Sequence, residues 1–108
     1  LSKVERVIEK NLEIEKFSGI GIGSPGPIDI ETGIILSSAN LVNLKNTPII
    51  SHIEKKFNLP VILNNDANCA ALGEFHFGKG KGLSNFIVLT LGTGLGGGCI
   101  LNGKIFNG

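Results

Sequence analysis

The chain has 108 residues, ten basic and nine acidic side chains, and 42% apolar residues. This length suits one domain that buries about two thirds of its unfolded surface. The net charge of +1 gives no electrostatic reason to expect nucleic acid or an anionic membrane as a partner. No apolar run approaches the roughly 20 residues that span a bilayer, and no segment resembles a signal peptide. We therefore expect a cytoplasmic protein.

Glycine and methionine are the unusual residues of this composition. The 16 glycines are about twice the usual share of roughly 7%, and methionine is absent from the sequence. Without an initiator methionine, and with an end just after a strand-like segment, the chain is interpreted as a piece of a longer protein. Two cysteines and two histidines make neither a disulfide framework nor the spacing of a zinc site.

The first elements follow from periodicity. Apolar residues at helical spacing predict a helix from Leu1 to Leu12, with Ser2 and Glu5 as a capping box. Residues 17–23 alternate glycine with isoleucine. They predict a buried strand with one face bare, so that a helix or a ligand can approach it closely.

Turn residues organise the next segment. The prolines and Gly26 predict a turn at 24–27, and a short hairpin is predicted over 28–36. Residues 37–46 are expected to form a polar loop. Thr47 and Pro48 are the expected N-cap and first residue of a second helix.

The last part of the chain alternates strands and helices. Residues 60–63 predict a buried strand, 67–77 a helix that ends at Gly78, and 86–91 the strongest strand. A glycine loop is predicted at 92–98, followed by a hairpin over 99–106 with Asn102-Gly103 as its turn. The order of elements predicts an α/β domain with a mixed sheet and flanking helices.

The glycine loop is the first candidate site. Gly92, Gly94 and Gly97 match G-x-G-x-x-G, but strand residues follow where a dinucleotide fingerprint needs a helix. A Walker-type loop is excluded because no Gly-Lys-Ser/Thr occurs. We favour a hairpin turn whose backbone amides and Thr93 hydroxyl bind a phosphate. A hairpin without a ligand is the alternative, disfavoured because so many glycines cost chain entropy.

The second candidate is Asn64-Asn-Asp66, between a strand and a helix. Ligands of α/β proteins collect at the carboxyl ends of strands, and a helix N-terminus favours the ionised carboxylate. Asp66 could therefore act as a general base. The alternative is that Asp66 only caps the helix, and composition alone favours that alternative.

The other reactive side chains lack partners at the spacing of a metal site or a catalytic pair. Both histidines are expected on helix surfaces, both cysteines in the core, and Glu74 in a structural role. The residues interpreted in this way are His52, Cys69, Glu74, His76 and Cys99. A solvated polar loop is expected to contain Ser37, Ser38 and Asn40.

Three segments together resemble the ROK family of bacterial glucokinases, fructokinases, N-acyl sugar kinases and sugar-responsive repressors. These segments are 21–29 (GIGSPGPID), 65–74 (NDANCAALGE) and 89–98 (LTLGTGLGGG). They occur in the family's order and at its approximate spacing, and the resemblance covers essentially all 108 residues.

The resemblance implies an incomplete ribonuclease H-like fold, of the actin/hexokinase/Hsp70-type ATPase class, and ATP-dependent phosphorylation of a sugar hydroxyl. It implies ATP and Mg²⁺ as cofactors, a hexose as substrate, and no metal ligand within this chain. Asp66 matches the family's catalytic base and a substrate contact. Asn65 and Asn40 match sugar-binding residues. The second phosphate loop is matched by Gly92, Thr93, Gly94 and Gly96.

The resemblance also implies parts outside the chain. A first phosphate loop would precede Leu1, and a Glu-x-x-His sugar pair, a zinc segment and the adenosine site would follow Gly108. Residues 1–108 are accordingly expected to be a single partial domain, the central part of the N-terminal lobe of a kinase for glucose or a close hexose. We expect this segment alone to be inactive and the parent protein to be a homodimer.

Two alternatives remain open. The first is the sugar-sensing effector domain of a ROK-family repressor, with a DNA-binding helix-turn-helix upstream. The second is a non-catalytic actin-like ATPase or interaction module. Asp66 favours the kinase, because a pure sensor needs no base.

Overall fold

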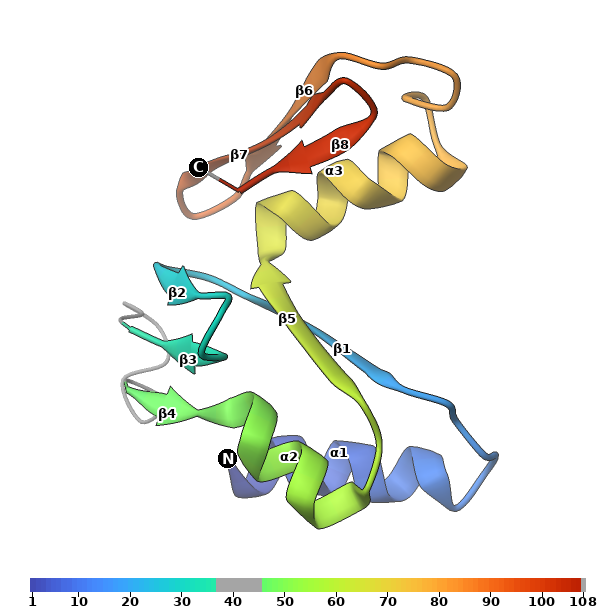
Figure 1. Ribbon diagram of the computed structural model, residues 1–108, viewed down its shortest axis with the longest axis vertical. Helices are drawn as coiled ribbons and strands as arrows, with labels where there is room; N and C mark the ends of the chain where they lie inside the picture. The colour runs from blue at the N-terminus through green and yellow to red at the C-terminus, as the bar shows by residue number, and fades with distance from the viewer. Residues whose placement is uncertain (37–45, 108) are drawn as a thin grey trace. The chain divides into compact units, whose positions relative to one another are not determined.

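The structure, a computed structural model, describes residues 1–36 and 46–107. Figure 1 shows the helices and strands along the chain. The backbone divides into two compact units, Leu1–Leu63 and Asn64–Gly108. That the chain is a single partial domain of one lobe stays a prediction. No helix among the described residues is long and apolar enough to cross a membrane.

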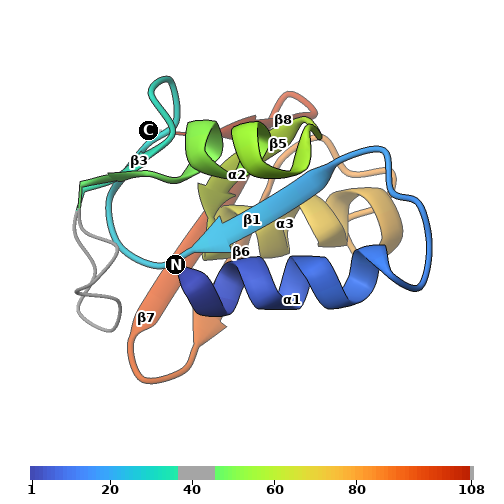
Figure 2. The ribbon, with the colours of Figure 1, turned by 90° about the horizontal axis from the view of Figure 1, so that it is seen from below.

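The described residues of the first unit form two helices and five strands. Two strands, β1 and β5, lie side by side, and β2, β3 and β4 form an antiparallel sheet. Figure 2 shows both helices of this unit alongside β1. The elements are α1 (Ser2–Leu12), β1 (Ile20–Ser24), β2 (Ile28–Asp29), β3 (Ile34–Ile35), β4 (Thr47–Pro48), α2 (Ile49–Phe57) and β5 (Val61–Asn65).

The core of this unit is aliphatic. Its buried members are Ile35, Ile49, Ile53, Val61 and Leu63, and apolar residues of α1 and β1 pack against them. The strand β5 is buried on one face only, because Ile62 between two buried neighbours is 76% exposed. The turn predicted at 24–27 is confirmed, and Gly26 has the positive φ (78°) expected of it.

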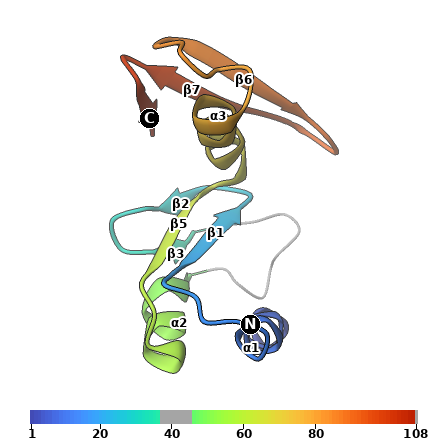
Figure 3. The same cartoon turned by 90° about the vertical axis from the view of Figure 1, so that its right-hand side faces the viewer.

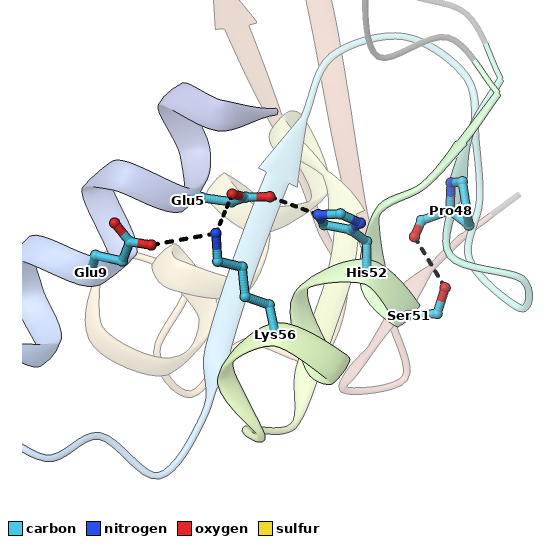
Figure 4. Close-up of polar contacts among 6 residues, drawn as sticks. All are labelled: Glu5, Glu9, Pro48, Ser51, His52 and Lys56. Atoms are coloured by element: carbon cyan, nitrogen blue, oxygen red, sulfur yellow. Dashed lines mark hydrogen bonds and ion pairs between the residues drawn. The ribbon is translucent and has the colours of Figure 1, made fainter.

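The start of each helix in this unit differs from the prediction. The capping box of Ser2 and Glu5 is wrong, because no side chain caps α1 and the Glu5 carboxylate instead binds His52 and Lys56 of α2 (Figure 4). Thr47 and Pro48 form β4 rather than the start of α2, because they pair with β3. In both cases a contact with a distant residue overrides the local signal.

The second unit is one helix on one antiparallel sheet. It contains α3 (Asp66–Phe77), β6 (Phe86–Leu91), β7 (Leu95–Leu101) and β8 (Lys104–Phe106), with the strands in the order β6-β7-β8. Figure 3 shows α3 end-on against the sheet. The predicted Asn102-Gly103 turn is confirmed, and both residues have the positive φ of a two-residue hairpin.

The glycine loop is shorter than predicted, because β7 begins at Leu95 and takes in three of the glycines. A Cβ on Gly98 would lie 2.5 Å from the Ala67 carbonyl oxygen and 2.7 Å from the Ala71 Cβ. Glycine is therefore required here so that α3 can lie close to the strand. Residues 92–94 alone form the turn.

Candidate active site

Two adjacent side chains at the corner between β5 and α3 make different contacts. Asn65 is the N-cap of α3, and its Oδ1 accepts hydrogen bonds from the backbone N–H of Ala67 (2.9 Å) and of Asn68 (3.4 Å). Asp66 is the first residue of the helix, and its side chain is exposed. The N-cap is therefore Asn65 and not Asp66, and a role of Asp66 beyond its bond to the helix start stays a prediction.

One oxygen of the Asp66 carboxylate is hydrogen-bonded to the backbone of α3, and the other is available to a ligand. Its Oδ1 accepts from the Ala67 N–H (2.8 Å), and its Oδ2 has no hydrogen-bond partner among residues 1–36 and 46–107. Burial, with a smaller contribution from the Asp66 charge, raises the pKa of the Cys69 thiol. Cys69 is thus kept in the thiol form, which is a poor nucleophile.

The turn between β6 and β7 is open. The Gly92 N–H donates to the Gly94 carbonyl (3.0 Å), and Thr93 lies between them. A Cβ built on Gly92 or Gly94 would meet no atom within 4 Å. The backbone of this turn can therefore approach a ligand, as a phosphate site requires.

Gly96 has a different environment from the turn glycines. A Cβ on Gly96 would collide with the Thr90 hydroxyl and lie 3.3 Å from the Ala67 Cβ. Ala67 directly follows Asp66, so this contact places the β6–β7 turn at the end of α3 that carries the carboxylate. Packing alone accounts for glycine at 96, and its role toward phosphate stays a prediction.

The remaining predicted residues fall into three groups. Asn40, with Ser37 and Ser38, lies outside the described residues. Glu74 is structural, because its Oε2 accepts from the Lys79 N–H (2.8 Å) and closes the loop after α3. Within the described ranges no group of three or more His, Cys, Asp or Glu side chains could hold a metal ion.

Sequence reasoning missed one residue near the corner. The Asn107 side chain accepts hydrogen bonds from Asn64 and Asn68. No local signal could have identified it, because its partners lie 43 and 39 residues earlier in the chain.

An exposed carboxylate can accept a proton from a hydroxyl, and a glycine turn with open space around its backbone can approach a phosphate. The model of the ROK family matches residues 1–108, and the chain belongs to this family. The resemblance found in the sequence and the expected actin/hexokinase-type fold are both confirmed.

Relatives include both kinases and a repressor. The chain is 47% identical over 90 residues to a glucokinase of Halalkalibacterium halodurans, covering 83% of this chain and 27% of the relative. It is 43% identical over 106 residues to a xylose repressor of Caldicellulosiruptor bescii, covering 97% and 26%. The solved structure of a ROK family glucokinase from Streptomyces griseus, in complex with glucose and AMPPNP, matches with a TM-score of 0.88 and 36% identity, covering 99% of this chain and 34% of that one. The chain thus spans about a quarter to a third of these relatives' length.

Proposed function

We propose that the full-length protein carrying this sequence is an ATP-dependent sugar kinase that phosphorylates glucose or a close hexose. The observation that carries the proposal is the division of roles at the start of α3. Asn65 caps the helix, so Asp66 Oδ2 is available to a substrate. The glucokinase relatives support the reaction type, and the Streptomyces griseus complex with glucose and AMPPNP supports a hexose and ATP as ligands.

In this mechanism Asp66 is the general base. Its carboxylate accepts the proton of a sugar hydroxyl while that oxygen forms a bond to the γ-phosphorus of ATP, and the bond from the γ-phosphorus to the β,γ-bridging oxygen breaks. The products are the sugar phosphate and ADP. Asn65 Nδ2 and Asn40 are assigned to the other sugar hydroxyls. In the turn at Gly92-Thr93-Gly94, the Thr93 and Gly94 amides and the Thr93 hydroxyl are assigned to the phosphates, since the Gly92 N–H already donates to the Gly94 carbonyl.

The residues of this chain fit a magnesium ion that is bound mainly through ATP. Mg²⁺ commonly uses one or two carboxylates together with substrate phosphates, and the described residues offer no larger cluster. When bound, Mg²⁺ neutralises phosphate charge. The family zinc site is assigned to a part of the protein outside residues 1–108.

The full-length protein is further proposed to be a homodimer in the cytoplasm. Neither a membrane nor nucleic acid is proposed as a partner of this segment.

The xylose repressor relative favours a second candidate, a sugar-sensing effector domain. In a repressor the same corner would bind sugar without phosphoryl transfer, and a helix-turn-helix segment would bind DNA. The sequence upstream of Leu1 in the full-length protein separates the two candidates. Sugar binding by that protein would also exclude a non-catalytic actin-like module.

The decisive test replaces Asp66 by Asn in the full-length protein. Asn retains Oδ1 and so keeps the bond to the Ala67 N–H, but it cannot accept the proton. We expect kcat to fall roughly 10²–10⁴-fold, with a smaller change in sugar affinity and an unchanged melting temperature. The coupled assay of ATP-dependent hexose phosphorylation measures this.

Asp29→Asn is the matched control. The Asp29 Oδ1 accepts from the backbone N–H of Glu31 (3.1 Å) and Thr32 (3.2 Å) in the first hairpin, and Asn keeps that oxygen. This variant should retain full activity. A folded Asp66→Asn protein with turnover near that of wild type would exclude Asp66 as the base.

A further inference from the structure

Four asparagine side chains of the second unit lie together at the start of α3. Asn64 Oδ1 accepts hydrogen bonds from the Asn65 N–H (2.8 Å) and from Asn68 Nδ2 (3.0 Å). Asn107 Oδ1 accepts from Asn64 Nδ2 (3.2 Å) and from Asn68 Nδ2 (3.3 Å). Asn107 directly follows β8. Its side chain thus ties the end of the sheet to the corner that carries Asp66.

The hydrogen bonds of this asparagine cluster (Asn64, Asn65, Asn68 and Asn107) leave little freedom at the corner. A side-chain amide has an acceptor oxygen and two donor hydrogens, and Asn64 uses both kinds of group. Asn68 is held at two points, because its backbone N–H donates to Asn65 and its side chain to Asn64 and Asn107. Asn107 contributes only its oxygen to these contacts.

We propose that Asn107 is a positioning residue. Through Asn64 and Asn68 it fixes the first turn of α3, and so it holds the Asp66 carboxylate in the orientation that meets the reacting hydroxyl. This inference rests on the proposed function, in which Asp66 is the base.

The effect on turnover follows from geometry. A displacement of about 1 Å in a catalytic group can reduce the rate by roughly 100-fold. Loss of Asn107 leaves the cap bonds of Asn65 and the bond between Asn64 and Asn68 in place. The corner is then loosened rather than lost, and we expect a reduction in kcat of about tenfold.

Two variants of nearly equal size separate positioning from packing. Asn107→Leu removes the acceptor oxygen, and Asn107→Asp keeps it. At about pH 8 carboxylates are ionised, so kinetics of the full-length protein are compared at that pH. Asn107→Leu should lower kcat about tenfold with the KM for ATP unchanged, and Asn107→Asp should restore most of the turnover. Asn11→Leu, the same change on the exposed surface of α1, is the control.

Hydrogen exchange gives a readout that does not depend on activity. In Asn107→Leu, amide exchange in the segment 64–70 should become faster than in wild type, whereas Asn107→Asp and Asn11→Leu should match wild type. Unchanged exchange in Asn107→Leu, turnover near the wild-type value, or failure of Asn107→Asp to restore turnover would each overturn the proposal. A wild-type protein that phosphorylates no hexose would instead refute the proposed function, and exchange would still decide whether Asn107 holds the corner.

Discussion

Asn65 and Asp66 are adjacent and similar in size, yet the fold gives them different roles. The extended backbone of Asn65 turns its Oδ1 back onto the helix start, whereas Asp66 already has its place in the first turn. The residue just before a helix is the usual cap because its side-chain oxygen can accept hydrogen bonds from the unpaired N–H groups of the first turn. A shift of the helix start by a single residue would therefore change which of the two side chains is available to a ligand.

The turn glycine at 94 permits a test of phosphate binding that is separate from stability. A Cβ at this position meets no atom within 4 Å, so Gly94→Val should fold as the wild type does. Its branched side chain would stand where the proposed phosphate approaches. We expect the KM for ATP to rise at least about tenfold, a loss of about 1.4 kcal/mol, with sugar binding nearly unchanged.

Gly97→Val is the control for this test, because residue 97 lies in β7 beyond the turn and a Cβ there makes only ordinary contacts, at 3.7 Å or more. Its ATP kinetics should be those of the wild type. If Gly94→Val also has wild-type ATP kinetics, the turn is an ordinary hairpin turn and the phosphate assignment fails.

At the scale of elements, the glycines of β7 are distinguished by the face on which they lie. Gly98 faces α3, where an added Cβ would press on the Ala67 carbonyl and Ala71, whereas Gly97 faces away. We expect Gly98→Val to lower the free energy of unfolding by roughly 1–3 kcal/mol, the usual cost of overpacking. Gly97→Val should have little effect or a slightly stabilising one, since valine favours strands. Urea denaturation of both variants measures the difference, and equal stabilities would contradict this account of β7.

The helices α1 and α2 are joined by a polar contact that depends on pH. Glu5 lies between His52 Nε2 (2.6 Å) and Lys56 Nζ (2.5 Å), and Lys56 also lies 3.4 Å from Glu9 (Figure 4). Hydrogen bonds from Lys56 and then His52 lower the pKa of Glu5 below its ordinary value of 4.5. The hydrogen bond to Glu5 raises the pKa of Lys56 above 10.5.

These directions define the pH range over which the contact stabilises the fold. A lowered carboxylate pKa gives stability that is present above pH 4.5 and is lost as the pH falls through the folded value. A raised lysine pKa gives stability that is present below pH 10.5 and is lost as the pH rises through the folded value. The contribution should therefore be present between these limits and decline on both sides.

Glu5→Gln tests this range. The melting temperature of the wild type should exceed that of Glu5→Gln by a small margin at neutral pH, because exposed ion pairs contribute little. The margin should disappear in acid and in strong alkali. Glu13→Gln, at a glutamate without an ion pair to any described side chain, should show no margin. A margin independent of pH would contradict the assignment.

The sequence predicted those elements whose signals are local. The hairpin turns at 31–33 and 102–103 follow from glycine and asparagine, and the strand at 86–91 follows from a run of apolar residues. The strand β4 could not be predicted, because it exists only through pairing with β3. The same limit applies at the site. Asp66 was identifiable from its own motif, whereas the contacts of Asn107 arise only when β8 returns to the start of α3.

At the scale of the molecule, the sheet of the second unit has one covered face and one open face. The strand register places six large apolar side chains on the face opposite α3. Their exposed fractions are 68% for Ile87, 64% for Leu89, 85% for Leu91, 72% for Leu95, 43% for Leu101 and 56% for Phe106. Soluble monomers rarely expose contiguous apolar patches of this kind. The chain spans only 26–34% of the relatives compared with it, so such a face is expected to be covered in a protein of their length.

This open face leads to a prediction about the 108-residue polypeptide produced by itself. It should bind a hydrophobic dye such as ANS much more strongly than the full-length protein does, because none of the described residues covers the apolar face of the β6–β8 sheet. It should also show no hexose phosphorylation above a blank, although Asp66 and the Gly92–Gly94 turn are both present. Positioning and electrostatic stabilisation together supply the rate enhancement in phosphoryl transfer, and a carboxylate with one glycine turn does not orient both substrates. Dye fluorescence and the coupled kinase assay, run on equal concentrations of the two proteins, measure both expectations. Turnover by the short polypeptide would show that residues 1–108 already contain a complete site, and the assignment of the missing contacts to other parts of the full-length protein would be wrong.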